Sequence, residues 1–284
     1  MPVVFVDSIA ALRPLLAEAR RTGTIGLVPT MGALHAGHTR LIDQARSDCD
    51  SVVVSIFVNP LQFDRGEDLQ RYPRPLDADL ELCTSLGVDF AFVPAPEEMY
   101  PAPPSCTIDV ARLADHLCGR HRPGHFRGVA TVALKLFQIV QPHRAYFGEK
   151  DAQQLAIVRR MVRDLNVPVE IVGVPTVREA DGLAVSSRNQ FLSSGERQLA
   201  TTLYDALTEA SRQIASGVSD PAAVKRAAVA RVPQKPELRL EYLEIVDREE
   251  MQPVVSICGP VCVAGALWVG STRLIDNVIC APHS

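Results

Sequence analysis

The sequence predicts an α/β fold, in which a parallel sheet flanked by helices is followed by a smaller α+β domain. Up to Pro175, short β-branched runs alternate with segments of helical periodicity, which is typical of βα units. Beyond Pro175, two helical segments precede three strand-like runs separated by turn residues, a pattern that favours an antiparallel sheet. We therefore expect one domain over residues 1–176 and a second over residues 177–284.

Buried parallel strands are expected in the first domain, because its β-branched runs lack polar alternation. The predicted strands are Thr24–Pro29, Ser51–Val58, Val88–Val93, Arg144–Phe147 and Val169–Val174. Two sets of apolar residues at helical spacing predict helices between these strands. The first set is Leu41, Ile42 and Ala45, and the second is Leu155, Val158, Met161, Val162 and Leu165.

Capping signals define the helices of the second domain. Ser193 and Glu196 have the spacing of a capping box, which predicts the start of a single helix reaching Ile214. Its apolar face would be Leu199, Leu203, Ala206, Leu207, Ala210 and Ile214. Asp220 before Pro221 predicts the N-cap of a second helix that ends at about Arg231. The predicted strands are Leu238–Val246, Val261–Gly270 and Arg273–Cys280.

Composition excludes several classes of protein. With 284 residues, 47% of them hydrophobic and 22% charged, the chain has the profile of a folded globular protein. A net charge of −4 and scattered aromatic residues argue against a nucleic-acid partner. No apolar run is long enough to cross a bilayer, and Asp7 interrupts the start before a secretory signal could form. We therefore expect a cytoplasmic protein with no membrane partner.

The seven cysteines predict neither a disulfide framework nor a zinc site. They are odd in number and dispersed, except for Cys258 and Cys262, which have no second pair of ligands nearby. We expect reduced thiols that serve mostly in packing.

The most informative stretch is Gly26–His38, where the first predicted strand ends and the first helix begins. Gly32 and Gly37 allow the backbone to approach a ligand closely, and the start of a helix favours an anion such as phosphate. His35 and His38 lie on one face of that helix start. An exposed turn with chance histidines and a His-x-x-His metal pair are the alternatives, although no further ligand has metalloprotease spacing.

His35-Ala-Gly-His38 after a first parallel strand resembles the His-x-Gly-His motif of the nucleotidyltransferase superfamily, whose domain is Rossmann-like. Further segments occur in the same order as in the pantothenate synthetase family, and together they cover nearly the whole chain. These segments are Pro29–His35, Phe57–Phe63, Arg71–Arg74, Arg122–Gly128, Ala145–Gln154, Arg178–Asn189 and Thr272–Asn277.

The resemblance implies that ATP joins (R)-pantoate to β-alanine through a pantoyl adenylate, with release of AMP and pyrophosphate. It implies catalytic roles for His35, His38, Lys150 and Arg188, with His38 as a proton donor. It implies ATP binding by Met31, Gly32, Ala33, Leu34, His35, Ala36, Gly37, His38, Gly148, Glu149, Lys150, Asp151, Val177, Val185, Ser186, Ser187 and Arg188. Gln62 and Gln154 would bind pantoate, Gln62 would also serve β-alanine, and Asn59 is a further candidate of the same type.

A homodimer is expected from the resemblance alone, and Mg²⁺ from the chemistry of ATP. Asp77 and Asp79 are not expected to bind the metal, because residues two apart do not share a helix face. The basic run Arg120–Arg127 could neutralise phosphates or form a solvated face.

Four positions depart from the residues that are usual in the family. Ala36 and Thr39 stand where an acidic residue and leucine are usual, and Cys118 and His121 stand where glutamate and serine are commoner. These departures bear on rate and packing rather than on the type of reaction.

Two other functions compete with this one: a nucleotidyltransferase that stops after nucleotide transfer, and a non-catalytic nucleotide-binding module. The first would not need Gln62 and Gln154, and the second would not need so many donors for a transition state.

Overall fold

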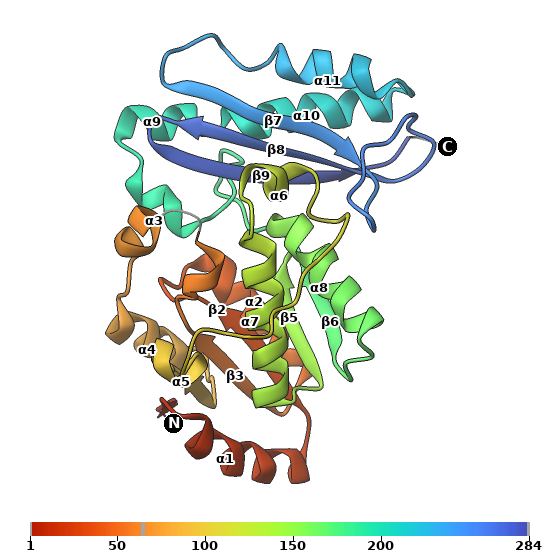
Figure 1. Cartoon of the computed structure of the whole chain (residues 1–284). Helices are drawn as coiled ribbons and strands as arrows, with labels where there is room; N and C mark the ends of the chain where they lie inside the picture. Colours follow the sequence, from red (N-terminus) through yellow and green to blue (C-terminus); the bar gives the residue numbers. More distant parts are fainter. Residues whose placement is uncertain (1, 64–65, 283–284) are drawn as a thin grey trace. The chain divides into compact units, whose positions relative to one another are not determined.

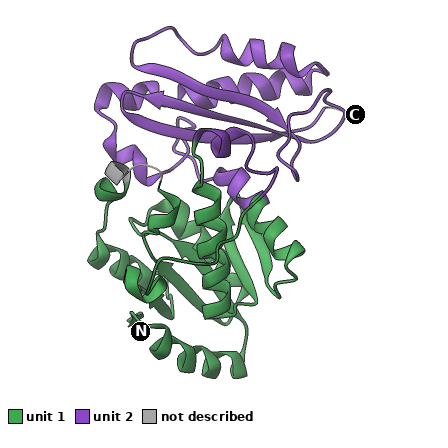
Figure 2. Ribbon diagram, viewed as in Figure 1, with its two compact units in different colours: residues 1–110, 122–149, 157–175 green, residues 111–121, 150–156, 176–284 purple. Residues whose placement is uncertain are grey.

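The computed structural model describes residues 2–63 and 66–282, which form two compact units (Figures 1 and 2). Unit 1 comprises Met1–Val110, Arg122–Glu149 and Ile157–Pro175, and unit 2 comprises Ala111–His121, Lys150–Ala156 and Thr176–Ser284. Two segments that precede residue 177 in the chain, 111–121 and 150–156, are therefore grouped with the C-terminal part. No helix within the described residues is long and apolar enough to span a bilayer.

Unit 1 contains a six-stranded sheet in which every pairing is parallel. Its strands are β1 (Val4–Val6), β2 (Ile25–Thr30), β3 (Ser51–Ile56), β4 (Phe90–Phe92), β5 (Arg144–Gly148) and β6 (Glu170–Val174). They lie in the order β1-β4-β3-β2-β5-β6. The chain moves outward from β2 through β3 and β4, and then returns to the other side of β2 with β5. The carboxyl ends of β2 and β5 thus form the switch point where open parallel sheets bind ligands.

Helices cover both faces of the parallel sheet. Helix α2 (Ala36–Asp48) packs on β2, β3 and β5, and its apolar face of Leu41, Ile42 and Ala45 is buried as predicted. Helices α1 (Ile9–Thr22) and α7 (His125–Val140) contact each other and β2 (Figure 1). The remaining helical segments before β6 are α3 (Gly66–Arg71), α4 (Leu76–Ser85), α5 (Pro96–Met99), α8 (Ala152–Asp164) and the 3₁₀ turns η1 (Pro60–Gln62) and η2 (Glu149–Asp151).

Unit 2 contains an antiparallel sheet of β7 (Leu238–Val246), β8 (Val261–Val269) and β9 (Thr272–Cys280), in that order. Helix α10 (Thr202–Ala215) packs on β8 and β9, and α11 (Pro221–Val229) packs on β7. Helix α6 (Leu117–His121) also contacts β8, which accounts for the burial of this strand along almost its whole length. The other helical segments are η3 (Ser187–Phe191) and α9 (Ser194–Leu199).

The predicted α/β fold with a smaller α+β part is confirmed, and the differences are local. Strand β1 and helices α1 and α7 were not predicted, so His35 and His38 lie at the start of the second α-helix rather than the first. The single helix predicted after Ser193 is wrong, because the structure divides it into α9 and α10 at Ala200–Thr201. Two adjacent threonines, of low helix propensity, lie at this break. Helix α11 ends at Val229, two residues before the predicted end.

Candidate active site

The loop that follows β2 turns sharply before α2 begins. Gly32 and Ala33 both have left-handed backbone conformations, with φ of 81° and 51°. A Cβ atom at Gly32 would lie 2.9 Å from an Asp79 carboxylate oxygen and 3.0 Å from Ile56, so the position also lacks room for a side chain. The predicted ATP segment 31–38 thus begins with a turn that requires glycine.

Asp79 holds this loop from helix α4. Its carboxylate accepts hydrogen bonds from the backbone N–H groups of Ala33 at 2.9 Å and Leu34 at 2.7 Å. Only 3% of Asp79 is exposed, and burial raises the pKa of its carboxyl group, while the two hydrogen bonds act in the opposite direction. From the sequence, Asp79 is not expected to bind a metal ion, and no other role is assigned to this residue. Asp79 lies four residues before Cys83 and therefore on the same face of the helix. This spacing could have indicated that the Asp79 side chain is buried.

We expect Asp79→Ala to lower the free energy of unfolding by about 1–3 kcal/mol, because two buried N–H donors lose their acceptor. Turnover should fall as well, since the loop leads directly into His35. The exposed Asp77 on the same helix provides a matched control, and Asp77→Ala should change neither quantity. Urea unfolding and steady-state turnover measure both effects. Equal stability of the two variants would show that Asp79 does not fix the loop.

His35 and His38 cap the start of α2 reciprocally. His35 is the N-cap residue, and its Nδ1 accepts from Gly37 N at 3.1 Å. Nδ1 of His38 accepts from His35 N at 3.2 Å, and the two ring centroids lie 4.1 Å apart. Because each Nδ1 accepts a backbone hydrogen, a neutral ring carries its proton on Nε2. The pair therefore lies at the positive end of a helix with the imidazole N–H groups placed to act as donors.

Gln62 and Asn59 lie in the turn after β3. Asn59 is 1% exposed, and its Nδ2 donates to Gly128 O and Gln62 Oε1, each at 3.1 Å. Its Oδ1 accepts from Tyr100 at 3.0 Å, and burial raises the pKa of Tyr100 to about 12, which keeps this hydroxyl protonated. Gln62 Nε2 lies 2.9 Å from Met31 Sδ, so the turn meets the segment after β2. Within unit 1, the structure brings Met31, Asn59 and Gln62 together.

Part of the basic run packs against this turn rather than facing solvent. Arg122 Nη2 and His125 Nδ1 donate to Gln62 O at 3.1 and 2.8 Å. A Cβ atom at Gly128 would lie 2.2 Å from Leu61 O, so only glycine allows α7 to approach η1 so closely. Arg127 forms an exposed ion pair with Asp109. Side chains of the segment 122–128 thus hold Gln62 in place by hydrogen bonds to its backbone carbonyl oxygen.

In unit 2, the two adjacent glutamines of α8 differ in their surroundings. Gln153 is buried, and its Nε2 donates to Leu113 O at 2.7 Å and His116 O at 2.8 Å. These bonds attach residues 111–121 to α8. Gln154, the predicted pantoate ligand, is only partly buried. Lys150 Nζ lies 3.5 Å from the carboxylate of Asp151.

The predicted second phosphate segment of unit 2 follows a short hairpin. Val185 N donates to Val177 O at 3.0 Å, and Arg178 and Ala184 form a β-bridge between these ends. The hairpin leads to η3, whose N-cap is Ser186, with its hydroxyl accepting from Arg188 N at 3.3 Å. The chain thus brings the predicted adenine contact Val177 next to Val185.

Two of the departures from the family pattern contact the same residue of unit 2, Tyr242. Cys118 Sγ lies 3.1 Å from the Tyr242 hydroxyl and 3.6 Å from Arg273, which pairs with Glu241 at 2.5 Å. The His121 ring stacks on Tyr242 with centroids 5.5 Å apart. These residues are occupied with packing and with one another, in agreement with an effect on local structure. All seven cysteines of the chain are free.

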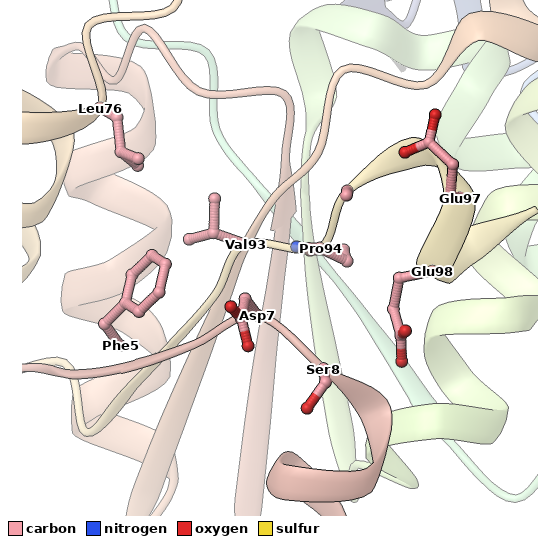
Figure 3. Close-up of a pocket in the computed structure, with 9 residues that line it drawn as sticks. Phe5, Asp7, Ser8, Leu76, Val93, Pro94, Glu97 and Glu98 are labelled. Carbon is pink, nitrogen blue, oxygen red and sulfur yellow. The ribbon is translucent and has the colours of Figure 1, made fainter.

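A hollow of about 710 Å³ lies elsewhere in unit 1, next to the ends of β1 and β4 (Figure 3). It is lined by Phe5, Asp7, Val93 and Glu97, among others, and by none of the predicted site residues. Within residues 2–63 and 66–282, no group of three or more His, Cys, Asp or Glu side chains is arranged to hold a metal ion.

A histidine-capped helix at the switch point of a parallel sheet places the protein in the class of α/β proteins that bind ligands at the carboxyl edge of the sheet. The family model for pantoate-beta-alanine ligase matches residues 4–279. The chain belongs to the pantoate-beta-alanine ligase family of enzymes.

Relatives and solved structures agree over the full length of the chain. Pantothenate synthetase from Moorella thermoacetica is 53% identical over 275 residues, covering 96% of this chain and 97% of the relative. The crystal structure of pantothenate synthetase from Thermus thermophilus has a TM-score of 0.92 and 48% identity, covering 97% and 99% of the two chains. A Francisella tularensis pantoate-beta-alanine ligase, described as complexed with beta-gamma ATP and beta-alanine, has a TM-score of 0.81 and 35% identity, covering 98% and 97%.

Proposed function

We propose that the chain condenses (R)-pantoate with β-alanine at the expense of ATP, through a pantoyl adenylate, and releases AMP and pyrophosphate. The observation that carries this proposal is the reciprocal cap of His35 and His38 at the switch point, in a chain of the pantoate-beta-alanine ligase family. The Francisella relative, whose structure is described as holding beta-gamma ATP and beta-alanine, supports the same substrates here.

In the first step, a carboxylate oxygen of pantoate attacks the α-phosphorus of ATP. The bond between that phosphorus and the bridging oxygen of pyrophosphate breaks, and negative charge develops on the phosphoryl oxygens. Donors already directed at these oxygens stabilise the transition state most effectively. We assign this role to His35, His38, Lys150 and Arg188. His38 would act as the proton donor of a hydrogen bond from Nε2–H to an oxygen of the departing pyrophosphate, because its Nδ1 already accepts from His35 N.

In the second step, the neutral amine of β-alanine attacks the acyl carbon of the adenylate. The carbon–oxygen bond to AMP breaks, AMP leaves, and the amine nitrogen loses a proton to solvent. The intermediate is needed because a carboxylate has no adequate leaving group for direct attack by an amine. ATP supplies that leaving group.

The remaining predicted residues bind and orient the substrates. We propose that ATP binds the backbone of 31–38, Gly148, Glu149 and Asp151, together with Val177, Val185 and Ser186–Ser187. Val177 would contact adenine through its backbone, since its side chain has no polar atoms.

The two glutamines would bind pantoate, and neutral amides suit a substrate that lies beside anionic ATP. Gln62 would also serve β-alanine. Asn59 already makes hydrogen bonds through both ends of its amide, so we propose that it orients Gln62 in addition to any substrate contact.

Mg²⁺ would bridge the phosphates of ATP and neutralise their charge. A metal held mainly by phosphates and water needs few protein ligands. We further propose that the protein is cytoplasmic and, as the resemblance implies, a homodimer. Light scattering on the purified protein would test the dimer.

The proposal predicts that ATP, (R)-pantoate and β-alanine together yield pantothenate and AMP in equal amounts. Omission of any one substrate, or chelation of Mg²⁺ with EDTA, should abolish product formation. A kinetic assay coupled to AMP, with pantothenate identified by mass spectrometry, measures this. Release of pyrophosphate with a stable adenylylated product, and with neither free AMP nor pantothenate, would instead support a nucleotidyltransferase that stops after nucleotide transfer.

A further inference from the structure

Two consecutive polar residues lie in the interior of unit 2, in the middle of strand β9. Asp276 and Asn277 are 5% and 7% exposed, and the neighbouring Leu274, Val278 and Cys280 pack in the apolar core. Polar groups in such a place are costly unless they are hydrogen-bonded. Their partners therefore indicate what the two residues are for.

Asn277 binds the backbone of the predicted phosphate lysine. Its Nδ2 donates to Lys150 O at 2.9 Å. Lys150 is the middle residue of η2, a single turn of 3₁₀ helix directly before α8. The amide of Asn277 thus fixes the main chain from which the Lys150 ammonium extends.

Asp276 binds the hairpin that precedes the second phosphate segment. Arg178 donates to both carboxylate oxygens of Asp276, at 2.6 and 3.0 Å, in a two-pronged ion pair. The same guanidinium donates to Gly182 O at 3.0 Å and Asn277 O at 3.2 Å, and it lies 4.2 Å from the centre of the Tyr204 ring. Arg178 therefore connects the hairpin to β9 through side-chain and main-chain acceptors.

The two anchors leave β9 on opposite faces, because successive side chains of a strand alternate. Leu274 and Val278, on the same side as Asp276, pack in the cluster that includes α10. Asp276 pairs with Gly265 on β8, and this glycine has no side chain to occupy the space beside the carboxylate. Asn277 points to the other face, to Lys150. One dipeptide thus holds two segments that are far apart in the sequence.

We infer that Asp276 and Asn277 are positioning residues for ATP, which set the places of Lys150 and of the Val177–Arg188 segment within unit 2. The inference rests on the proposed function, because that proposal assigns both segments to ATP. A buried ion pair is seldom more stabilising than apolar packing of the same volume, and in some proteins its use is to specify one conformation. This favours positioning over stability as the use of Asp276 and Arg178.

Asn277→Ala and Asn277→Ser remove the amide donor to Lys150 O. We expect the Kd for ATP, measured by calorimetry without the other substrates, and the KM for ATP to rise about three- to tenfold, the effect of one lost hydrogen bond. The KM for pantoate should stay unchanged. Val278→Ala is the matched control on the same strand: it should lower the urea midpoint and leave the Kd for ATP unchanged.

Unchanged ATP affinity in both Asn277 variants would overturn the inference. So would equal changes in all substrate constants for Asn277→Ala and Val278→Ala, since that result would indicate a purely structural role. Wild-type protein that fails to bind ATP would overturn the proposed function itself. If the wild-type protein binds ATP and both Asn277 variants bind it equally well, only the inference is overturned.

Discussion

His38→Ala should reduce turnover by about 10²- to 10³-fold, the usual loss when one transition-state donor is removed. The substitution also removes the acceptor for His35 N, so part of any effect could come from the cap of α2. His38→Gln separates the two contributions, because glutamine at the third helical position completes a capping box without an imidazole.

We expect His38→Gln to unfold at nearly the wild-type urea concentration and still to lose most of the turnover. Asp43→Ala, an exposed change on the same helix, should leave both properties unaltered. Near wild-type turnover in a folded His38→Ala protein would remove His38 from the mechanism.

Lys150→Ala should slow the formation of the adenylate by about 10²-fold, since a positive charge on the phosphoryl oxygens is lost. The KM for pantoate should change little. Gln154→Ala should do the reverse and raise the KM for pantoate far more than the KM for ATP. Single-turnover measurement of AMP formation, at varied concentrations of each substrate, distinguishes the two patterns.

Lys225→Ala provides the control for loss of a lysine in unit 2. Lys225 pairs with Glu244 and has no assigned role with substrates, so its removal should affect neither constant. Equal losses for both substrates in the Lys150 and Gln154 variants would contradict the division of their roles.

The sequence could predict most of the fold, because its signals are local. Continuous β-branched runs identify buried parallel strands wherever they occur, and the capping pair Asp220–Pro221 identifies the start of α11. Strand β1 was not predicted, although Val3-Val4-Phe5-Val6 carries the same signal, and it lies at the edge of the sheet beside β4. The division between α9 and α10 depends on a break too short to be seen in the apolar periodicity.

The candidate site could be predicted only where a motif carries it. His35 and His38 are close in the sequence, so their shared helix start follows from spacing. The support of Asp79 for the loop after β2 depends on a contact between residues about 45 positions apart. The bonds of Asp276 and Asn277 to Arg178 and Lys150 span still longer separations. Such support comes from tertiary contacts, which no local pattern predicts.

Exchange of labelled pyrophosphate into ATP tests the proposed adenylate most directly. We expect exchange when ATP and pantoate are present and β-alanine is absent, because pyrophosphate leaves before the amine reacts. His38→Ala should lose the exchange in proportion to its turnover. Exchange that requires β-alanine would contradict a separate adenylate step, and ADP in place of AMP as the product would indicate an acyl phosphate and overturn the account.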